Sequence, residues 1–524
     1  MSTIESICPG CSVGCGLYVI KDDSSIDIDY RKRAPVNEGK ICKFGVKLSK
    51  YYSKEQAKPM IKEGDVQKEV ELGPAIEEAA KRLKEVQGGS GADSIAFVSS
   101  GLATNEELLA LLELSSALGC TNLECGLGKF SQINLEALKL GIPFEEIEHA
   151  KNVVIILLDP FVQYPLLSRN ILKAKKNGAK VLNIGISEVG AADKTVIIDP
   201  KEQLSKLQAL VGYLKDKGED DTFDGVEPFF EDSVIISDLN ALSDAEVIKA
   251  ICNINALTDS KMLFMKPYAN LSGAAMLGFT SKDGGIDGLL NDIDEGKIKA
   301  LYLLESDLLG TALDEEKVSE ALKKLDLLIV QNSLKTKTSI LADILLPNDL
   351  FFEKKGSVVN GEGRVLCNMG DGVSGIEIIG KITEASGGKN IDYETAHAKV
   401  QEKLGISEVN EDKIPLKRAD KGKKKVLKME KAQERTGEHF LVLKTNPFFW
   451  CGMAEKHVVE LSIGNVKKLG LNKGENIGLK SDGSIESIKF KVSDIPENVV
   501  ITETKLSLAK EPVSGVSLER LQSG

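Results

Sequence analysis

The sequence is poor in aromatic residues, in histidine and in long apolar runs, and each shortage narrows what the chain can do. Aromatic residues make up 5% of the 524 residues, and there are only four histidines. No apolar run reaches the length of about 18 residues that marks a membrane-spanning helix, so we expect no direct membrane insertion. The N-terminus shows neither an apolar signal core nor a twin-arginine signal, which predicts a cytoplasmic location.

Positive charge is also in short supply. The 67 lysine and arginine residues are outnumbered by 79 aspartate and glutamate residues, and the net charge is −12. Nucleic-acid binding needs a basic surface that meets phosphate groups, so we expect no nucleic-acid partner. Hydrophobic residues still make up 42% of the chain, enough for sizeable buried cores. At roughly 100–200 residues per domain, the length predicts about three to four domains.

Cysteine is scarce too, but four of the nine cysteines stand close together near the N-terminus. They are Cys8, Cys11, Cys15 and Cys42, separated by two, three and 26 residues. An odd number of cysteines in a cytoplasmic chain does not indicate a disulfide framework. Four soft sulfur ligands suit zinc or an iron–sulfur cluster, and a zinc ribbon more often shows two Cys-x2-Cys knuckles. The spacing therefore favours a [4Fe–4S] cluster, with zinc or plain buried cysteines as the alternatives.

The pattern of apolar runs and turns predicts an α/β protein with a small N-terminal [4Fe–4S] cap and a C-terminal β-barrel-like domain. The cap has few apolar residues, so it needs a bound metal or another cross-link to fold. Continuous apolar strands that alternate with helices beyond the cap predict parallel sheets covered on both faces. The predicted segments are the cluster cap 1–55, a doubly wound α/β domain 56–265, a second doubly wound domain 266–410, a charged linker 411–436 and a β-rich domain 437–524.

Two stretches of the α/β region share one pattern. In each, a strand–helix–strand unit is followed by an Ala-Asp pair, an apolar strand and a proline. The pairs are Ala192-Asp193 before Pro200, and Ala342-Asp343 before Pro347. This repetition predicts two related doubly wound domains that face one another, and coincidence between two generic βαβ units is the alternative.

The cysteine segment resembles a known family. Cys8-Pro9-Gly10-Cys11-Ser12-Val13-Gly14-Cys15-Gly16, followed by Asn37-Glu38-Gly39-Lys40-Ile41-Cys42, is similar to the cluster-binding head of the molybdopterin oxidoreductase superfamily. Within that superfamily it is most similar to the catalytic subunits of formate dehydrogenases. The resemblance implies that Cys8, Cys11, Cys15 and Cys42 bind a [4Fe–4S] cluster, with Lys43 beside it.

Further motifs extend the resemblance along most of the chain. Asn270-x-x-Gly273-Ala274-x-x-x-Gly278 resembles a glycine-rich loop that approaches the cofactor in that family. Ala342 to Pro347 and Glu353 to Arg364 resemble its most recognisable downstream motif, and Leu469-Gly470-Leu471-x-x-Gly474 resembles its dinucleotide-binding module. The family cofactor is molybdopterin guanine dinucleotide with Mo or W, and the resemblance would place it near Asn270, Gly273 and Gly278.

The sequence departs from the family where the metal would bind. Family enzymes bind it through cysteine, selenocysteine or serine, and in formate dehydrogenases a histidine follows. When residues 119–130 are aligned on their Gly-x-x-Asn start, the ligand position falls near Lys129. A protonated lysine has no lone pair to give a metal. Cys125 is the candidate catalytic metal ligand only if the loop is four residues shorter than this alignment assumes. The alternative is that Cys125 is simply a small buried side chain.

Acidic residues stand where the family places contacts to pterin phosphates. Asp159, Glu305 and Asp307 follow predicted strands, and each negative charge is expected to repel a diphosphate. The lysine that bridges cluster and pterin in the family is replaced by Phe44, with Lys43 adjacent. These losses resemble the large subunit of respiratory complex I, which keeps the fold without the metal.

Three functions follow from these observations. The first is an iron–sulfur redox subunit that passes electrons through one [4Fe–4S] cluster inside a multi-subunit complex, without a working Mo or W site. The second is an active formate or formylmethanofuran-type dehydrogenase, and the third is a scaffold with a structural cluster. No nicotinamide or flavin glycine motif follows a strand. We therefore expect a ferredoxin-like or flavin-bearing partner subunit that docks near residues 1–55.

Overall fold

The computed structural model of the chain describes residues 1–133, 138–216, 221–280, 284–417, 425–433, 435–454 and 458–521. The chain forms two compact units, and each combines two separate stretches of sequence. The first unit is Met1–Leu140 with Lys266–Ala419, and the second is Gly141–Met265 with Asp420–Gly524. Among the described residues, no helix has both the length and the apolar character needed to cross a membrane.

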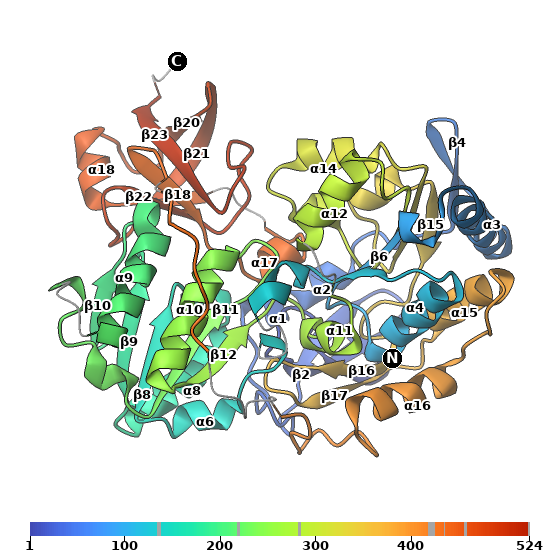
Figure 1. Cartoon of the computed structure of the whole chain (residues 1–524), viewed down its shortest axis with the longest axis horizontal. Helices are drawn as coiled ribbons and strands as arrows, with labels where there is room; N and C mark the ends of the chain where they lie inside the picture. The colour runs from blue at the N-terminus through green and yellow to red at the C-terminus, as the bar shows by residue number, and fades with distance from the viewer. Residues whose placement is uncertain are drawn as a thin grey trace. The chain divides into compact units, whose positions relative to one another are not determined.

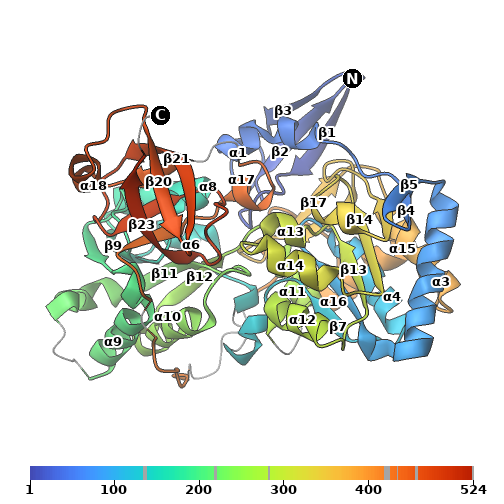
Figure 2. The same cartoon turned by 90° about the horizontal axis from the view of Figure 1, so that it is seen from above.

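The N-terminal cap belongs to the first unit and is a three-stranded antiparallel sheet. Its strands are β1 (Ser2–Ile7), β2 (Gly16–Lys21) and β3 (Ile26–Tyr30), in that order. Two short helices follow, α1 (Lys43–Val46) and α2 (Leu48–Tyr52). Ile7, Leu17 and Val19 are fully buried under the sheet, and β1 lies beside β17 (Val365–Met369) of the same unit (Figure 2).

The body of the first unit is a seven-stranded sheet. Its order is β5 (Val66–Glu69), β4 (Met60–Glu63), β15 (Ile344–Pro347), β14 (Leu327–Asn332), β13 (Ala300–Leu304), β6 (Ile95–Ser99) and β7 (Asn122–Glu124). The five strands from β15 to β7 are parallel, and the β4–β5 hairpin adds two antiparallel strands at one edge. The inner strands β6, β13 and β14 are buried throughout, which explains their unbroken apolar sequences.

Helices cover both faces of this sheet. One face packs on α12 (Gly285–Asp294) and α14 (Glu315–Leu322), through alternate residues such as Leu301 and Leu303. The opposite face meets α3 and α4, and the hairpin of β16 and β17 completes the unit with four further helices. The remaining bounds are α3 (Leu72–Ser90), α4 (Asn105–Ala117), α11 (Leu271–Leu277), α13 (Leu308–Thr311), α15 (Ser374–Ala385), α16 (Tyr393–Leu404) and β16 (Lys355–Val359).

The second unit begins with a five-stranded parallel sheet. Its order is β10 (Lys194–Ile197), β9 (Lys180–Gly185), β8 (Asn152–Ile156), β11 (Ser233–Asp238) and β12 (Lys261–Met265). Its helices pack in pairs, α9 beside α10 and α6 beside α8 (Figure 1). Their bounds are α6 (Phe144–Glu148), α7 (Pro160–Gln163), α8 (Pro165–Lys176), α9 (Gln203–Asp216) and α10 (Ala245–Thr258).

The C-terminal part of the second unit is a closed six-stranded barrel, which confirms the predicted barrel-like domain. Its strands close in the order β18, β22, β19, β21, β20 and β23 around a core that includes Val459, Leu461 and Ile477. Their bounds are β18 (His439–Leu443), β19 (Val458–Leu461), β20 (Asn476–Ser481), β21 (Ser484–Val492), β22 (Val499–Thr502) and β23 (Val513–Arg520), with helices α17 (Pro447–Trp450) and α18 (Ile463–Lys468).

The sheet pairing corrects the expected boundaries of the α/β domains. We expected residues 56–265 to form one domain, but β6 pairs with β13 and belongs to the sheet of the second predicted domain. The physical reason is that an apolar strand can pair with any buried neighbour, and its sequence does not say which. The two α/β domains are therefore interleaved in the chain.

The repeated Ala-Asp pattern marks a shared structural detail. The Asp193 carboxylate accepts a hydrogen bond from the Val181 amide at 2.8 Å, and the Asp193 amide donates to the Val181 carbonyl at 2.7 Å. Asp343 makes the same two bonds with Leu328, at 2.7 and 2.8 Å. In both sheets, the aspartate clamps the start of the neighbouring strand.

A second detail also recurs. Leu157 and Glu305 each follow a central strand in the left-handed backbone conformation, with φ values of 51° and 48°. Two residues later, Asp159 and Asp307 cap the helices α7 and α13. A non-glycine residue rarely adopts positive φ. Its appearance at equivalent points of both sheets favours duplication over coincidence.

The charged linker is partly bound to the second unit. Residues 418–424 and 434, which include much of its lysine run, lie outside the described residues. Leu427 exchanges two hydrogen bonds with the side chain of Asn253 on α10, at 2.7 and 2.9 Å. The amide of Glu430 donates to Glu246 on the same helix at 2.8 Å. Residues 425–433 are therefore anchored along α10, whereas we expected a solvated linker. The earlier linker residue Glu411 accepts hydrogen bonds from Arg364 and Cys367 of the first unit.

Candidate functional site

The structure brings the cap cysteines together at the end of the three-stranded sheet. Cys8 and Cys15 are buried, and Cys11 and Cys42 are half-buried. The Cys8 amide donates to the Cys15 carbonyl at 2.7 Å, and the Gly14 amide donates to the Cys11 carbonyl at 3.1 Å. Burial raises the pKa of the Cys8 thiol, and the nearby thiolates of Cys42 and Cys11 raise it further. The electrostatic influence of Cys42 and Cys11 on Cys8 shows that these three cysteines lie near one another.

Gly14 has a conformation and a position that only glycine fits. Its φ is +70°, and a Cβ there would lie 2.7 Å from Leu366 and 3.0 Å from the Cβ of Asn360. The Asn360 side chain donates to the Val13 carbonyl at 3.1 Å, and the Gly361 amide donates to the Ser12 carbonyl at 2.7 Å. The loop after β16 therefore forms a seat for the loop that carries Cys11 and Cys15.

We expect Gly14→Ala to lose most of the iron that the cap binds, because the new methyl group collides with its seat. Gly64→Ala is the matched control, since Gly64 has a φ of +60° but open space around its Cβ. Both variants carry a backbone cost of about 1 kcal/mol. Iron per chain after anaerobic purification is the measurement. Equal iron in the two variants would contradict the packing role of Gly14.

Asn37 joins the two cysteine-bearing loops. Its side chain is 1% exposed and accepts from the Gly16 amide at 2.8 Å. It also donates to the carbonyls of Gly16 at 3.0 Å and Lys40 at 2.8 Å. Gly16 follows Cys15, and Lys40 precedes Cys42 by two residues. Asn37 therefore fixes the fourth cysteine relative to the first three.

A third segment closes the cap loop from the side. Residues 266–269 run antiparallel to residues 9–12, with a bridge between Cys11 and Pro267. The Ser12 amide donates to the Lys266 carbonyl at 3.0 Å, and the Lys266 amide donates to the Ser12 hydroxyl oxygen at 2.8 Å. The Ala269 amide donates to the Pro9 carbonyl at 3.1 Å.

The donor set of the cap is four cysteine sulfurs on loops that are held by three other segments. Among the described residues, no three side chains of His, Cys, Asp or Glu are grouped closely enough to hold a single metal ion. A [4Fe–4S] cluster is held by four cysteine thiolates, which are the ligands that the cap supplies. The residues present therefore fit such a cluster.

Cys125 lies in the loop after β7, beside a carboxylate that uses the loop amides. Glu124 is 3% exposed, and one of its oxygens accepts from the amides of Cys125, Gly126 and Gly128 at 3.0, 2.6 and 2.9 Å. Burial raises the pKa of the Cys125 thiol, and the Glu124 carboxylate raises it further. The positive charge of Lys266, which is fully buried, lowers the pKa of the Cys125 thiol. Burial and Glu124 are the two largest influences, so the pKa of the Cys125 thiol is raised overall.

The expected cofactor residues Asn270, Gly273 and Gly278 have structural partners. The Asn270 side chain accepts from the Val359 amide at 2.7 Å and donates to the Ala103 carbonyl at 2.8 Å. A Cβ on Gly273 would lie 2.1 Å from the Asn270 side-chain oxygen, so close packing demands glycine there. Gly278 ends α11 with a φ of 104°. Their role at a cofactor stays a prediction.

The three acidic residues that we expected to repel a diphosphate are largely compensated. Asp159 caps α7 and pairs with Lys444 of the second unit at 3.0 Å, and both side chains are mostly buried. Asp307 accepts from the amides of Gly310 and Thr338, both at 3.0 Å. Both carboxylates are satisfied by partners within the protein, so they should repel a diphosphate less than the sequence suggested.

The third of these residues, Glu305, belongs to a buried charged network that sequence reasoning missed. Lys354 is 2% exposed and lies 2.8 Å from Glu305 and 3.0 Å from Glu107. Asn348 donates to both carboxylates, at 2.8 and 2.7 Å. Burial raises the pKa of Glu305, while Lys354 opposes this shift. The sequence held one signal, because Thr104 and Glu107 form the capping box that starts α4.

A second network was also missed. Glu106, which is fully buried, accepts from the Ser357 amide at 2.7 Å and from the Ser357 hydroxyl at 2.9 Å. His397 on α16 lies 2.8 Å from the same carboxylate. This hydrogen bond raises the pKa of His397. The serine donates to glutamate and not to histidine, so the trio lacks the arrangement of a hydrolase triad.

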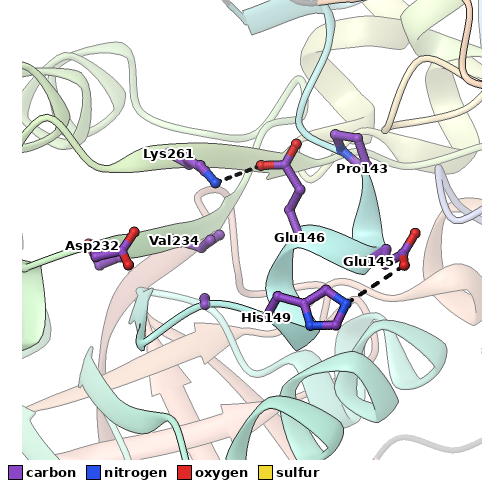
Figure 3. A pocket seen from close by; sticks show the side chains of 9 residues that line it. Pro143, Glu145, Glu146, His149, Asp232, Val234 and Lys261 are labelled. Atoms are coloured by element: carbon purple, nitrogen blue, oxygen red, sulfur yellow. Dashed lines mark ion pairs between the residues drawn. The ribbon is translucent and has the colours of Figure 1, made fainter. Parts of the chain in front are cut away.

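A cavity of about 340 Å³ lies in the second unit, away from the predicted site residues. Figure 3 shows its charged side chains paired within it, Glu146 with Lys261 at 2.9 Å and Glu145 with His149 at 3.7 Å. The remaining lining residues include Pro143, Asp232 and Val234. Glu146 and Lys261 neutralise one another, and the other carboxylates of the lining, Glu145 and Asp232, do not favour an anionic cofactor.

Two protein families match this sequence, one over the cap and one over most of the α/β region. The sequence matches the molybdopterin oxidoreductase Fe4S4 domain over residues 1–54 and the molybdopterin oxidoreductase family over residues 57–370. The F420-dependent formate dehydrogenase subunit alpha of Methanocaldococcus jannaschii is 28% identical over 69% of this chain and 66% of its own length. The F420-dependent formate dehydrogenase 2 subunit alpha of Methanococcus maripaludis is 25% identical over 75% and 72%.

Among the solved structures with the same fold is an acetylene hydratase. Acetylene hydratase from Pelobacter acetylenicus superposes with a TM-score of 0.61 over 95% of this chain and 92% of that one. The two sequences are 13% identical. The chain spans somewhat less than two thirds of the Methanocaldococcus subunit, so the activity of that protein does not pass directly to this one.

Proposed function

We propose that this chain, which belongs to the molybdopterin oxidoreductase family, is the iron–sulfur redox subunit of a multi-subunit complex. In this proposal, Cys8, Cys11, Cys15 and Cys42 bind one [4Fe–4S] cluster, and the chain has no working Mo or W site. The observation that carries the proposal is the convergence of four thiols in a cap held by Gly14, Asn37 and the loop after β16. A cluster bound there would supply one-electron transfer.

The residues of the cap position the sulfur ligands. Asn37 holds the loop of Cys42 against Gly16. Asn360, in the loop after β16, holds the loop that carries Cys11 and Cys15. Cys11 and Cys42 are half-buried, so the cap places sulfur near the surface. A half-exposed cluster can exchange electrons with a protein that docks on the cap.

The loop around Cys125 supports the absence of a working metal site. Cys125 is 7% exposed and lies beside the Glu124 carboxylate, which are the surroundings of a small buried side chain. Glu124 also uses three amides of the loop, which are therefore not available to a bound anion. Lys129, at the aligned ligand position, has no lone pair when protonated. These groups do not fit a Mo or W centre.

An active formate or formylmethanofuran-type dehydrogenase is the alternative. Two observations favour it. The charge of Lys266 lowers the pKa of the Cys125 thiol, and the backbone of Lys266 is hydrogen-bonded to the loop that carries Cys11. A metal on Cys125 would therefore lie close to the cluster. The third function, a scaffold with a structural cluster, requires the same cap but no electron transfer.

The test is an assay for formate-dependent dye reduction after expression with molybdate or tungstate. The proposal expects no turnover, together with a cap chromophore that dithionite bleaches reversibly. Robust turnover that Cys125→Ala abolishes would establish the alternative. A chromophore that no electron carrier can reduce would establish the scaffold.

The partner and the location belong to the same proposal. The relatives are named as alpha subunits, which supports partner subunits for this chain. We infer a ferredoxin-like or flavin-bearing partner in the cytoplasm, without nucleic acid. Purification of the native protein as a monomer without a redox partner would count against this part of the proposal.

A further inference from the structure

The cap carries a positive charge that contrasts with the rest of the chain. Residues 31–54 contain eight lysine and arginine residues and one acidic residue, Glu38, which gives a net charge of +7 in a chain of net charge −12. This segment includes Cys42 and lies between the cap sheet and the first body strands. The charge is therefore concentrated beside the proposed cluster.

Five exposed residues of this segment, Lys32, Arg33, Lys40, Lys43 and Val46, are here called the basic cap face. Lys50 and the single acidic residue, Glu38, are exposed as well. Lys40 precedes Cys42 by two residues, and Lys43 follows it directly. A Cβ on Gly39 would lie 3.0 Å from the Cα of Lys32, so Lys32 lies beside the Lys40 turn.

The charges of this face are available to a partner. None of Lys32, Arg33, Lys40 and Lys43 makes an ion pair with another described residue. Val46, on α1, is 58% exposed and supplies an apolar contact within the charged face. Buried Asn37 holds the loop that presents Lys40, so the face has a fixed backbone.

The acidic residues of the cap are spread along its sheet: Glu5 is on β1, Asp27 and Asp29 are on β3, and two more lie in a turn at the far end. Asp22 and Asp23 lie in the β2–β3 turn, next to the Lys21–Ile26 pair of the register. The cysteine end is marked by the Ile7–Gly16 pair. A six-residue strand spans roughly 20 Å, about twice the screening length at physiological salt. The acidic turn therefore does not cancel the potential near Cys42, although Asp27 and Asp29 lie along β3 between the two ends.

We propose that the basic cap face docks a small, strongly acidic protein that carries single electrons. The inference rests on the proposed function and adds the charge and the docking residues of the partner. Opposite charge steers such encounters, and weak redox complexes are small and sensitive to salt. In the step itself, the reduced carrier loses one electron and the cluster gains it, with no proton or bond exchanged.

The test measures binding of an oxidised acidic bacterial-type ferredoxin to the full chain, purified anaerobically with its cluster. Affinity for the oxidised ferredoxin is measured by calorimetry at low and high salt. Electron transfer to the oxidised cluster is measured by stopped flow with the same ferredoxin after its reduction by dithionite. The double variant Lys32→Glu with Lys40→Glu should slow association by on the order of tenfold or more, and raised salt should do the same to the unmodified chain. Iron content should stay unchanged in the variant.

The matched control is Lys84→Glu with Lys473→Glu, two exposed lysines outside the cap that give the same change in net charge. It should bind the ferredoxin as the unmodified chain does. Equal effects of the two double variants, or no salt dependence, would overturn the docking surface. Tighter binding of duplex DNA or of anionic phosphatidylglycerol vesicles than of ferredoxin would also overturn it.

The outcomes separate this inference from the proposed function. A protein that holds iron and is reduced chemically, but binds ferredoxin without regard to Lys32 and Lys40, contradicts only the docking surface. A protein without iron contradicts the proposed function itself.

Discussion

Replacing Lys354 with methionine should destabilise the first unit by about 3–5 kcal/mol, because it leaves two buried carboxylates without their counter-ion. Lys354 is 2% exposed, and its ammonium contacts Glu107 and Glu305 at 3.0 and 2.8 Å. Asn348 satisfies one oxygen of each carboxylate but supplies no charge. The midpoint of urea unfolding is the measurement. A loss of less than about 1 kcal/mol would contradict this role.

The control variant is Lys355→Met, which changes the adjacent lysine. Its side chain is 43% exposed, and its partner Glu394 is 78% exposed. Exposed ion pairs contribute about 0–1 kcal/mol, so this variant should unfold almost as the unmodified chain does. Adding Glu305→Gln to Lys354→Met should restore part of the lost stability, since one buried charge is then removed.

The deficit of Lys354→Met should also depend on pH. Burial and Glu107 raise the pKa of Glu305, and Lys354 holds it down. Without the lysine, the folded-state pKa of Glu305 rises further above its unfolded value. A carboxyl with a raised folded pKa binds protons more tightly in the folded state, so stability increases as the pH falls. We therefore expect the deficit to be smaller at about pH 5.5 than at about pH 7.5.

Replacing Cys11 with serine should remove the cluster from the cap. One of four sulfur ligands is lost, so we expect iron to fall from about four atoms to well below one per chain. The visible absorbance should bleach, and amides of residues 1–54 should exchange faster with solvent because the cap has lost its staple. The body should keep its fold, since its sheet does not depend on the cap thiols.

Cys125→Ala is the control for that experiment. Cys125 is 7% exposed and lies in the loop after β7. Its replacement should leave iron and absorbance unchanged. Equal iron loss in both variants would mean that the cluster ligands are misassigned, and stoichiometric zinc in the unmodified chain would mean that the cap is a zinc site.

The sequence predicted helices and strands well where neighbouring residues alone determine them. The unbroken apolar residues 300–304 form the strand β13, and the apolar-periodic residues 105–117 form the helix α4. The cluster cap and the barrel were also expected, and both are present. Apolar periodicity, caps and turns fix such elements within a few residues.

The sequence failed where pairing is long-range. The strand β6 is about 200 residues away from its partner β13 in the sequence, and no local signal links them. The network of Glu107, Glu305 and Lys354 was missed for the same reason, because its members come from three distant segments. We expected Glu305 to repel a diphosphate, because its buried partner Lys354 could not be known from the sequence.

The central claim is that the chain holds one [4Fe–4S] cluster and no working Mo or W centre. Elemental analysis of the anaerobically purified protein, expressed with both molybdate and tungstate in the medium, tests it most directly. The account predicts about four iron atoms per chain, with Mo and W far below one atom per chain. Stoichiometric Mo or W with released pterin would contradict it, and so would an absence of iron.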